Sequence, residues 1–147
     1  MRIVALCAWA VTAAAGLYLL GTWVVEGGVR RVQHGPGRHR RFPPILVFGH
    51  FLLAVGGLVT WIVFVVTQHS MLAWAGFATL LLVATMGLAM FVRWVPGYRA
   101  KHRSGRLGAA HREPPERHLP PTVVFGHGVM AVTTVVLVLL TAIGVDS

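Results

Sequence analysis

The sequence is poor in acidic residues and has one cysteine. Its 147 residues include four carboxylates against 13 Lys and Arg side chains. None of the carboxylates lies in the middle of an apolar run; they are Glu26, Glu113, Glu116 and Asp146. Carboxylates inside a membrane are the usual parts of proton relays, and Mg²⁺ and Ca²⁺ prefer oxygen ligands. A carboxylate-driven pump or a divalent-cation carrier therefore finds little support.

Other chemical motifs are missing as well. The single cysteine, Cys7, excludes an intrachain disulfide and a cysteine-based metal site. The sequence contains no Gly-rich phosphate loop and no His-Glu-x-x-His motif. No serine shares a plausible helix face with a histidine and an acid. Hydrolase or transferase chemistry is not supported, and whether the chain is an enzyme stays open.

Long apolar runs dominate what is present. The chain is 56% apolar and 12% charged, which is a membrane composition. A spanning helix needs roughly 20 mainly apolar residues. Four segments meet this requirement: about 3–25, 43–67, 71–93 and 121–144. We therefore expect an all-α, integral membrane four-helix bundle that forms a single transmembrane domain over 1–147.

The basic residues predict the orientation of the bundle. Twelve of the 13 Lys and Arg residues fall in, or directly before, the connectors 26–42 and 94–120. Both connectors lie on one side of a four-helix arrangement, and the positive-inside rule makes that side cytoplasmic. We expect a multi-pass protein of the cytoplasmic membrane with both termini outside. The same charges would attract anionic lipid headgroups, whereas nucleic acid is not an expected partner.

A short phrase occurs twice in the sequence. Residues 43–59 read PPILVFGHFLLAVGGLV and residues 120–136 read PPTVVFGHGVMAVTTVV, with 9 of 17 positions identical. The match of Ala8-Trp9-Ala10 with Ala73-Trp74-Ala75 extends the repeat to the other two helices. We expect two parallel two-helix repeats, about 1–67 and 68–147, related by an axis along the membrane normal. Trp9, Trp74, Trp23 and Trp94 are expected in the interfacial aromatic belts.

Each copy of the phrase places one histidine inside an apolar run. His50 and His127 lie about two helical turns after their Pro-Pro starts, so we expect them at equal depth. An ionisable residue at this depth is a functional-site hypothesis by default. The residues beside them are small, which leaves room for close helix contact or a flat ligand; they are Gly49, Ala54, Gly126 and Ala131.

Haem b is the ligand that fits this pattern best. Two neutral imidazoles that face each other across a bundle can supply both axial ligands of a haem iron. The propionates would need cations at the near interface, and Arg41 and Arg93 are the candidates. In its four-helix architecture and its two Gly-His pairs, the chain resembles the membrane b-type cytochromes with bis-histidine ligation. The resemblance implies one b-haem, electron transfer, and a quinone or a redox protein as partner.

Other functions remain open from the sequence. One is a cofactor-free accessory or assembly subunit, in which the histidines bond carbonyls of neighbouring helices. Another is a small transporter or a quinone-binding protein. Oligomerisation or membership of a larger complex fits any of these. The remaining histidines are expected to be solvated or to face headgroups; they are His34, His39, His69, His102, His111 and His118.

Overall fold

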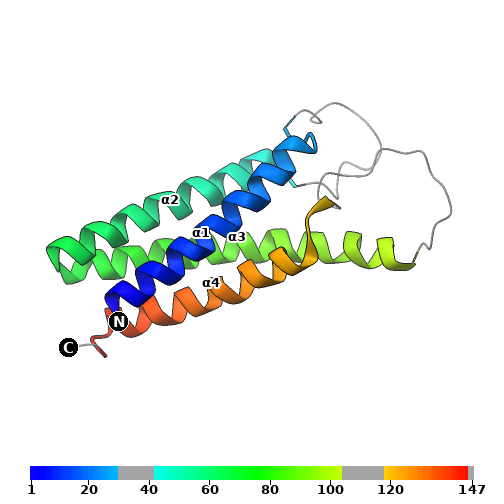
Figure 1. The fold of residues 1–147 in the computed structure, drawn as a ribbon. Helices are drawn as coiled ribbons and strands as arrows, with labels where there is room; N and C mark the ends of the chain where they lie inside the picture. Colours follow the sequence, from blue (N-terminus) through cyan, green and yellow to red (C-terminus); the bar gives the residue numbers. More distant parts are fainter. Residues whose placement is uncertain (30–41, 104–117, 146–147) are drawn as a thin grey trace.

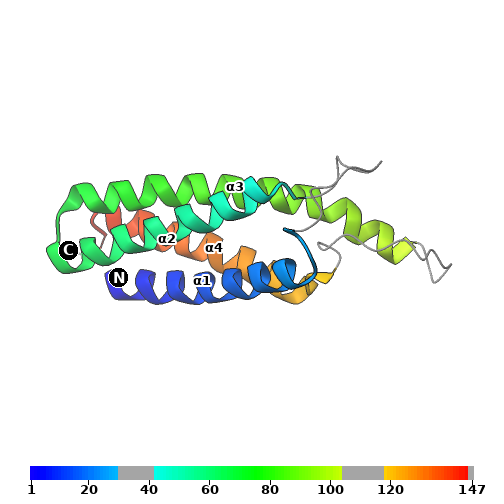
Figure 2. The same ribbon diagram turned by 90° about the horizontal axis from the view of Figure 1, so that it is seen from above.

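Four helices run side by side with alternating direction. The computed structural model describes residues 1–29, 42–103 and 118–145. The helices are α1 (Arg2–Val25), α2 (Pro44–Thr67), α3 (Ser70–Arg103) and α4 (Pro121–Ala142). Figures 1 and 2 show them as one elongated bundle. Each helix is long and apolar enough to cross a membrane. The prediction of an all-α bundle of four membrane-length helices is confirmed.

The two ends of the bundle differ in what they contain. At one end, which we call the connector end, α1 and α3 end while α2 and α4 begin. At the other, the terminus end, lie both chain termini and the short turn between α2 and α3 (Figure 1). Each helix packs on two neighbours: α1 on α4 and α2, and α3 on α2 and α4. Helices α2 and α4 therefore lie diagonally across the bundle.

Proline pairs set the starts of α2 and α4. Pro44 and Pro121 are the first helical residues, where the missing N–H costs nothing. The preceding prolines, Pro43 and Pro120, are extended with ψ of 130° and 122° because a residue before proline avoids the helical region. Each pair thus fixes where its helix begins, and with it the depth of every residue that follows.

Helix α1 ends at the connector end in a Schellman motif. Gly27 has φ of +85°, a conformation that glycine adopts without strain. The N–H of Gly28 donates to the Trp23 carbonyl (2.9 Å) and that of Gly27 to the Val24 carbonyl (3.0 Å). The motif turns the chain back so that Gly28 lies directly against the indole of Trp23.

Helix α3 is longer than the sequence predicted. It continues through Pro96 to Arg103, so the expectation of a connector that starts at residue 94 is wrong. Proline is tolerated in membrane helices when neighbouring groups compensate for the missing N–H. Here the rings of Trp94 and Tyr98 stack one turn apart with centroids 4.9 Å from each other. The last turns of α3 project beyond the other helices (Figure 1).

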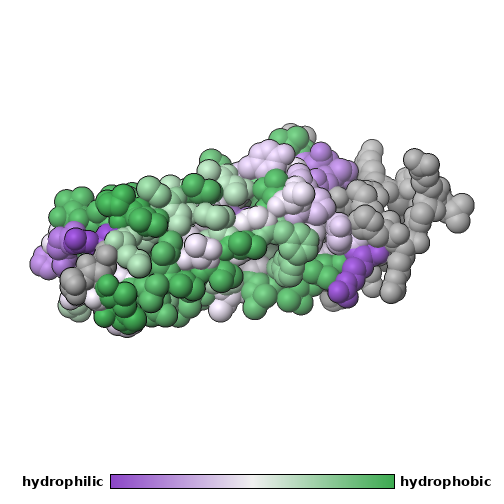
Figure 3. Space-filling view, turned by 60° about the horizontal axis from the view of Figure 1, so that its bottom comes forward, coloured by the Kyte–Doolittle hydropathy of each residue, from purple (hydrophilic) through white to green (hydrophobic). Residues whose placement is uncertain are grey.

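The outside of the bundle is apolar along most of its length. Large apolar side chains such as Ile45, Val66 and Met71 are exposed on the helix faces. Figure 3 shows apolar residues covering the middle of one face, with hydrophilic residues towards its two ends. This distribution suits a bundle whose middle contacts lipid.

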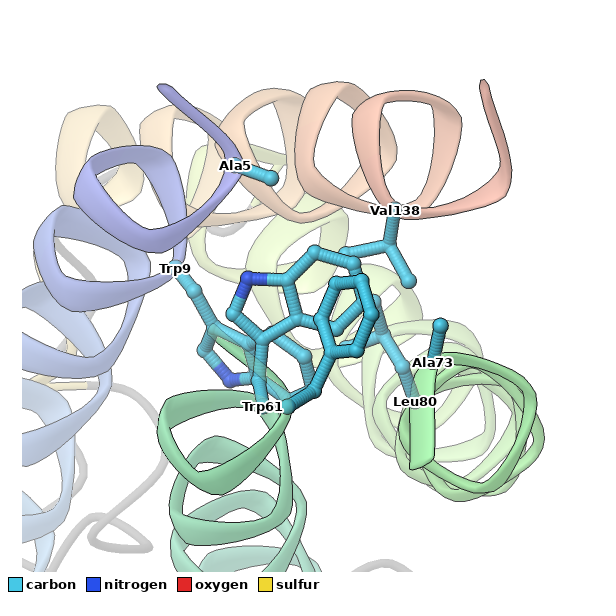
Figure 4. Packing of buried hydrophobic residues seen from close by; sticks show 7 residues of the cluster. Ala5, Trp9, Trp61, Ala73, Leu80 and Val138 are labelled. Carbon is cyan, nitrogen blue, oxygen red and sulfur yellow. The ribbon is translucent and has the colours of Figure 1, made fainter. Parts of the chain in front are cut away.

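Two hydrophobic cores fill the inside of the bundle. The terminus-end core consists of Ala5, Trp9, Trp61, Phe64, Ala73, Leu80 and Val138. Figure 4 shows the Trp9 and Trp61 rings side by side beneath Ala5, with Ala73 and Val138 across from them. The connector-end core consists of Trp23, Phe42, Val47, Trp94 and Leu119. The two cores leave a short section of the bundle between them.

The tryptophans depart from the interfacial positions that the sequence suggested. Trp9, Trp23 and Trp94 are all buried in the two cores, so the belt assignment is wrong for these three. Trp74 is 48% exposed and occupies a different environment from Trp9, which is 2% exposed. The Ala-Trp-Ala match therefore does not pair equivalent positions. A hydropathy pattern alone cannot separate an interfacial indole from one that packs between helices near their ends.

Candidate functional site: a histidine pair across the bundle

The structure brings the two repeated histidines together. His50 lies on α2 and His127 on α4, each six residues after the proline that starts its helix. Their ring centroids are 6.4 Å apart, with 67° between the ring planes. Because α2 and α4 are diagonal, the two imidazoles meet across the middle of the bundle, in the section between the two cores.

Each imidazole is held by a backbone carbonyl of a neighbouring helix. Nδ1 of His50 lies 3.0 Å from the Val83 carbonyl oxygen on α3. Nδ1 of His127 lies 3.0 Å from the Thr12 carbonyl oxygen on α1. A carbonyl only accepts, so each Nδ1 must carry the proton and donate it. In the neutral ring, Nε2 then keeps a free lone pair, and neither Nε2 has a hydrogen-bond partner among the described residues.

A glycine one turn after each carbonyl allows the imidazole to approach. A Cβ on Gly16 would lie 3.0 Å from Cε1 of His127, and one on Gly87 would lie 3.2 Å from Cε1 of His50. Side chains on a helix tilt towards its N-terminus, over the carbonyls of the preceding turn. A larger residue at either position would therefore cover the carbonyl that the histidine uses.

The contacts of the two histidines are equivalent. Thr12 corresponds to Val83, Gly16 to Gly87 and Trp23 to Trp94. The two members of each pair are separated by the same number of residues in the sequence. These pairs define the equivalence of α1 with α3 better than the Ala-Trp-Ala match does. Each histidine contacts the helix from the other half of the chain: His50 contacts α3 and His127 contacts α1.

The surroundings of the two histidines differ on the side of each ring that faces the terminus end. Beside His127, the hydroxyl oxygens of Thr12 and Thr134 lie 3.1 Å apart and link α1 to α4. The position that corresponds to Thr134 is Gly57, against which the indole of Trp9 packs. One histidine thus has a small polar contact next to it, whereas the other has an aromatic one.

Of the small residues expected around the histidines, Gly126 is placed differently from the expectation. Gly126 is exposed, and nothing lies within 4 Å of a Cβ built there, so it faces away from the histidine pair. A Cβ on Gly49 would meet Cε of Met86 at 3.1 Å. Ala54 and Ala131 are half-buried. The glycines whose Cβ positions meet the imidazoles are Gly16 and Gly87.

Sequence reasoning missed Gly16 and Gly87 because they lie on the helices that lack histidine. A signal was present: Gly16-Leu17 matches Gly87-Leu88, and Trp23-Val24 matches Trp94-Val95, at the same spacing. The Ala-Trp-Ala match aligns α1 with α3 at a different offset, and that offset is wrong.

Of the two cations expected at the near interface, the structure describes one. Arg93 is exposed on α3, and Arg41 lies outside the described residues. His118 is partly exposed, with its Nδ1 3.7 Å from a Glu26 carboxylate oxygen, and His69 is exposed in the turn. The remaining connector histidines lie outside the residues whose side chains are described; they are His34, His39, His102 and His111.

The donor set limits which metals the pair could hold. Within residues 1–29, 42–103 and 118–145, no group of three or more His, Cys, Asp or Glu side chains comes together. Structural zinc takes four ligands, so two imidazoles alone do not make such a site. A haem iron needs only axial ligands from the protein, because the macrocycle supplies the others.

The separation of the two rings is compatible with a shared iron. With a metal–nitrogen distance of about 2 Å on each side, two opposed imidazoles place their ring centroids roughly 6 Å apart. The observed separation is 6.4 Å. Metal-bound histidines usually donate their other ring N–H to a carbonyl or carboxylate, as both Nδ1 atoms do here.

The fold and the site together define a class: a helical bundle of membrane-length helices with a histidine pair on its diagonal helices. Comparison with models of protein families, with curated proteins and with solved structures found no match to this chain.

Proposed function

We propose that this chain is a small b-type cytochrome, or the haem-carrying membrane subunit of a redox complex. His50 and His127 would be the two axial ligands of one haem. The observation that carries the proposal is the matched pair of imidazoles, 6.4 Å apart, whose Nδ1 atoms are both bound to carbonyls. Both Nε2 lone pairs then remain for an iron.

The residues of the chain would fix the ligands before haem binds. The carbonyls of Val83 and Thr12 select the tautomer with hydrogen on Nδ1 and hold each ring in its orientation. Gly87 and Gly16 keep that contact open. A haem iron with two imidazole ligands takes up and releases one electron. His50 and His127 would both hold the haem, and the role that this arrangement would support is electron transfer.

The proposed location is the cytoplasmic membrane, with the connector end on the cytoplasmic side and both termini outside. The basic connectors support this orientation through the positive-inside rule. The histidines lie nearer to the connector end, about 9 Å along each helix from its first residue. A quinone or a redox protein that exchanges electrons with this haem would therefore approach most closely from the cytoplasmic side.

A cofactor-free packing role is the second candidate, and the same hydrogen bonds favour it. His50 joins α2 to α3 and His127 joins α4 to α1. Interhelical hydrogen bonds of this kind contribute roughly 0.6 kcal/mol on average in membranes. An accessory subunit could use both histidines for assembly alone. In that role, however, both Nε2 atoms stay without a function.

A visible difference spectrum separates the two candidates. The protein is purified in detergent from cells supplied with haem, and its reduced-minus-oxidised spectrum is recorded. The proposal predicts Soret and α bands typical of a b-haem. Absence of these bands from a well-folded, helical preparation would overturn the proposal and leave the packing role.

Single substitutions then assign the ligands. His50→Ala and His127→Ala should each abolish or shift the bands, since either change removes an axial ligand. His118→Ala is the matched control, because His118 is partly exposed near the connector end. His111→Ala, in a connector, serves as a second control. Equal spectra from all four variants would contradict the assignment.

A further inference from the structure

Trp23 carries a buried donor that has nothing to bond. The residue is 2% exposed, and its indole Nε1 has no hydrogen-bond partner. It is the one such side-chain atom found among the described residues. Buried polar groups in proteins almost always have a partner, so an exception needs an explanation such as a bound ligand.

The position of Trp23 relates it to the histidine pair. It lies seven residues after Gly16, on the same face of α1 and about 10 Å further along the helix. Gly16 itself contacts His127. Long side chains on a helix generally lean towards its N-terminus, which for Trp23 is the direction of the histidines.

Gly28 and Phe48 cover the indole of Trp23 at the connector end. A Cβ on Gly28 would collide with Cε2 of the indole, so the backbone of the Schellman motif covers the ring. The ring of Phe48 packs edge-on, with its centroid 6.3 Å away. The donor is thereby kept from solvent on the connector side, and an acceptor within the bundle would satisfy it.

We infer that Nε1 of Trp23 donates a hydrogen bond to a carboxylate of the ligand held between His50 and His127. This inference rests on the proposed function and names the acidic part of that ligand as the group that is recognised. A porphyrin with propionate side chains has carboxylates at one edge of a flat apolar ring, and that edge would face the connector end.

The test compares an acidic porphyrin with its ester. The full-length protein, freed of haem in detergent, is titrated with ferric protoporphyrin IX and with the dimethyl ester of the same compound. The two differ only at the carboxylates. Because a hydrogen bond to a charged group is stronger than one to a neutral group, we expect the preference for the acid to fall about tenfold in Trp23→Phe.

Trp61→Phe is the matched control. Trp61 is also a buried tryptophan, but it lies in the terminus-end core and its Nε1 donates to the Arg2 carbonyl at 3.4 Å. The control should keep the wild-type preference for the acid. Comparing the preference between variants cancels the difference in how the two porphyrins partition into detergent.

The outcomes distinguish the inference from the proposed function. If wild-type protein binds neither porphyrin with histidine-dependent bands, the proposed function fails. If it binds both and Trp23→Phe keeps the wild-type preference, the inference alone is overturned. Should Trp23→Phe not fold, the indole N–H resonance of Trp23 in ¹⁵N-labelled wild-type protein decides. It should shift with the acid and not with the ester, and equal shifts would overturn the inference.

Discussion

The two ends of this bundle differ in how similar the residues are at equivalent positions of the two repeats. At the connector end, the corresponding residues are equal or similar in type: Trp23 with Trp94, Phe42 with Leu119, and Val47 with Val124. At the terminus end, each aromatic residue corresponds to a smaller, non-aromatic one: Trp9 with Leu80, Trp61 with Val138, and Phe64 with Thr141. The histidine pair lies between the symmetric core and the asymmetric one.

Under the proposed function, this difference between the two cores has a reason in the symmetry of the ligand site. A ligand with an axial imidazole on each side requires two matching histidines, two matching carbonyls and two matching glycines. The terminus-end core has no such requirement, and it is filled by unequal partners. Trp61 packs against Trp9 and Phe64 with ring centroids 6.2 and 4.8 Å away (Figure 4). Under the proposed function, the terminus end holds the bundle together and the section beside the connector-end core holds the ligand.

The largest effect on stability should come from the asymmetric core. Trp61→Ala removes a fully buried indole, and substitutions of this kind cost about 3–5 kcal/mol. We expect a large fall in the unfolding free energy in detergent, with the b-haem bands unchanged in the folded fraction. Val138→Ala should cost less because fewer atoms are lost. Loss of the bands together with the Trp61 side chain would break the division between the two ends.

Glycine substitutions beside the imidazoles should act on the site more than on stability. Gly16→Leu and Gly87→Leu place side chains where Cε1 of each histidine now lies, at a packing cost of about 1–3 kcal/mol. We expect each to displace its imidazole and to abolish or shift the haem bands. Gly126→Leu is the matched control, since nothing lies within 4 Å of its Cβ position. A stronger spectral effect from Gly126→Leu would contradict the arrangement of the site.

The smallest effect should come from the polar contact beside His127. Thr134→Val removes the hydroxyl that lies 3.1 Å from that of Thr12 and should cost roughly 0.6 kcal/mol, typical of interhelical hydrogen bonds in membranes. Thr133→Val is the control, because Thr133 is exposed and bonds only the carbonyl of Val129 on its own helix. Unfolding measurements on both variants should separate them. Equal losses would mean that the Thr12–Thr134 contact contributes nothing.

Much of the fold follows from the sequence for a simple physical reason. The apolar lengths predict four spans, and the Pro-Pro pairs predict where α2 and α4 begin and how deep the histidines lie. The end of α3 was missed because Pro96 and the charges after it are typical of a connector. In the structure, the rings of Trp94 and Tyr98 stack on either side of Pro96 in the sequence, and the helix continues to Arg103.

The candidate site was predicted in part. The approach of His50 to His127 could be inferred from the repeat, although the carbonyls that hold them could not, because they belong to Thr12 and Val83 on other helices. Small residues near the histidines in sequence were taken as the lining. Helix packing decides which small residues meet the imidazoles, and it selects Gly16 and Gly87 from the partner helices.

The electron paramagnetic resonance spectrum of the oxidised, haem-loaded protein tests the central claim most directly, because it reports how the iron is ligated. With His50 and His127 both bound, the account predicts a single low-spin ferric signal, which either His→Ala variant converts to high spin or abolishes. A high-spin signal from the wild-type protein, or a low-spin signal that survives in both variants, would contradict ligation by this histidine pair.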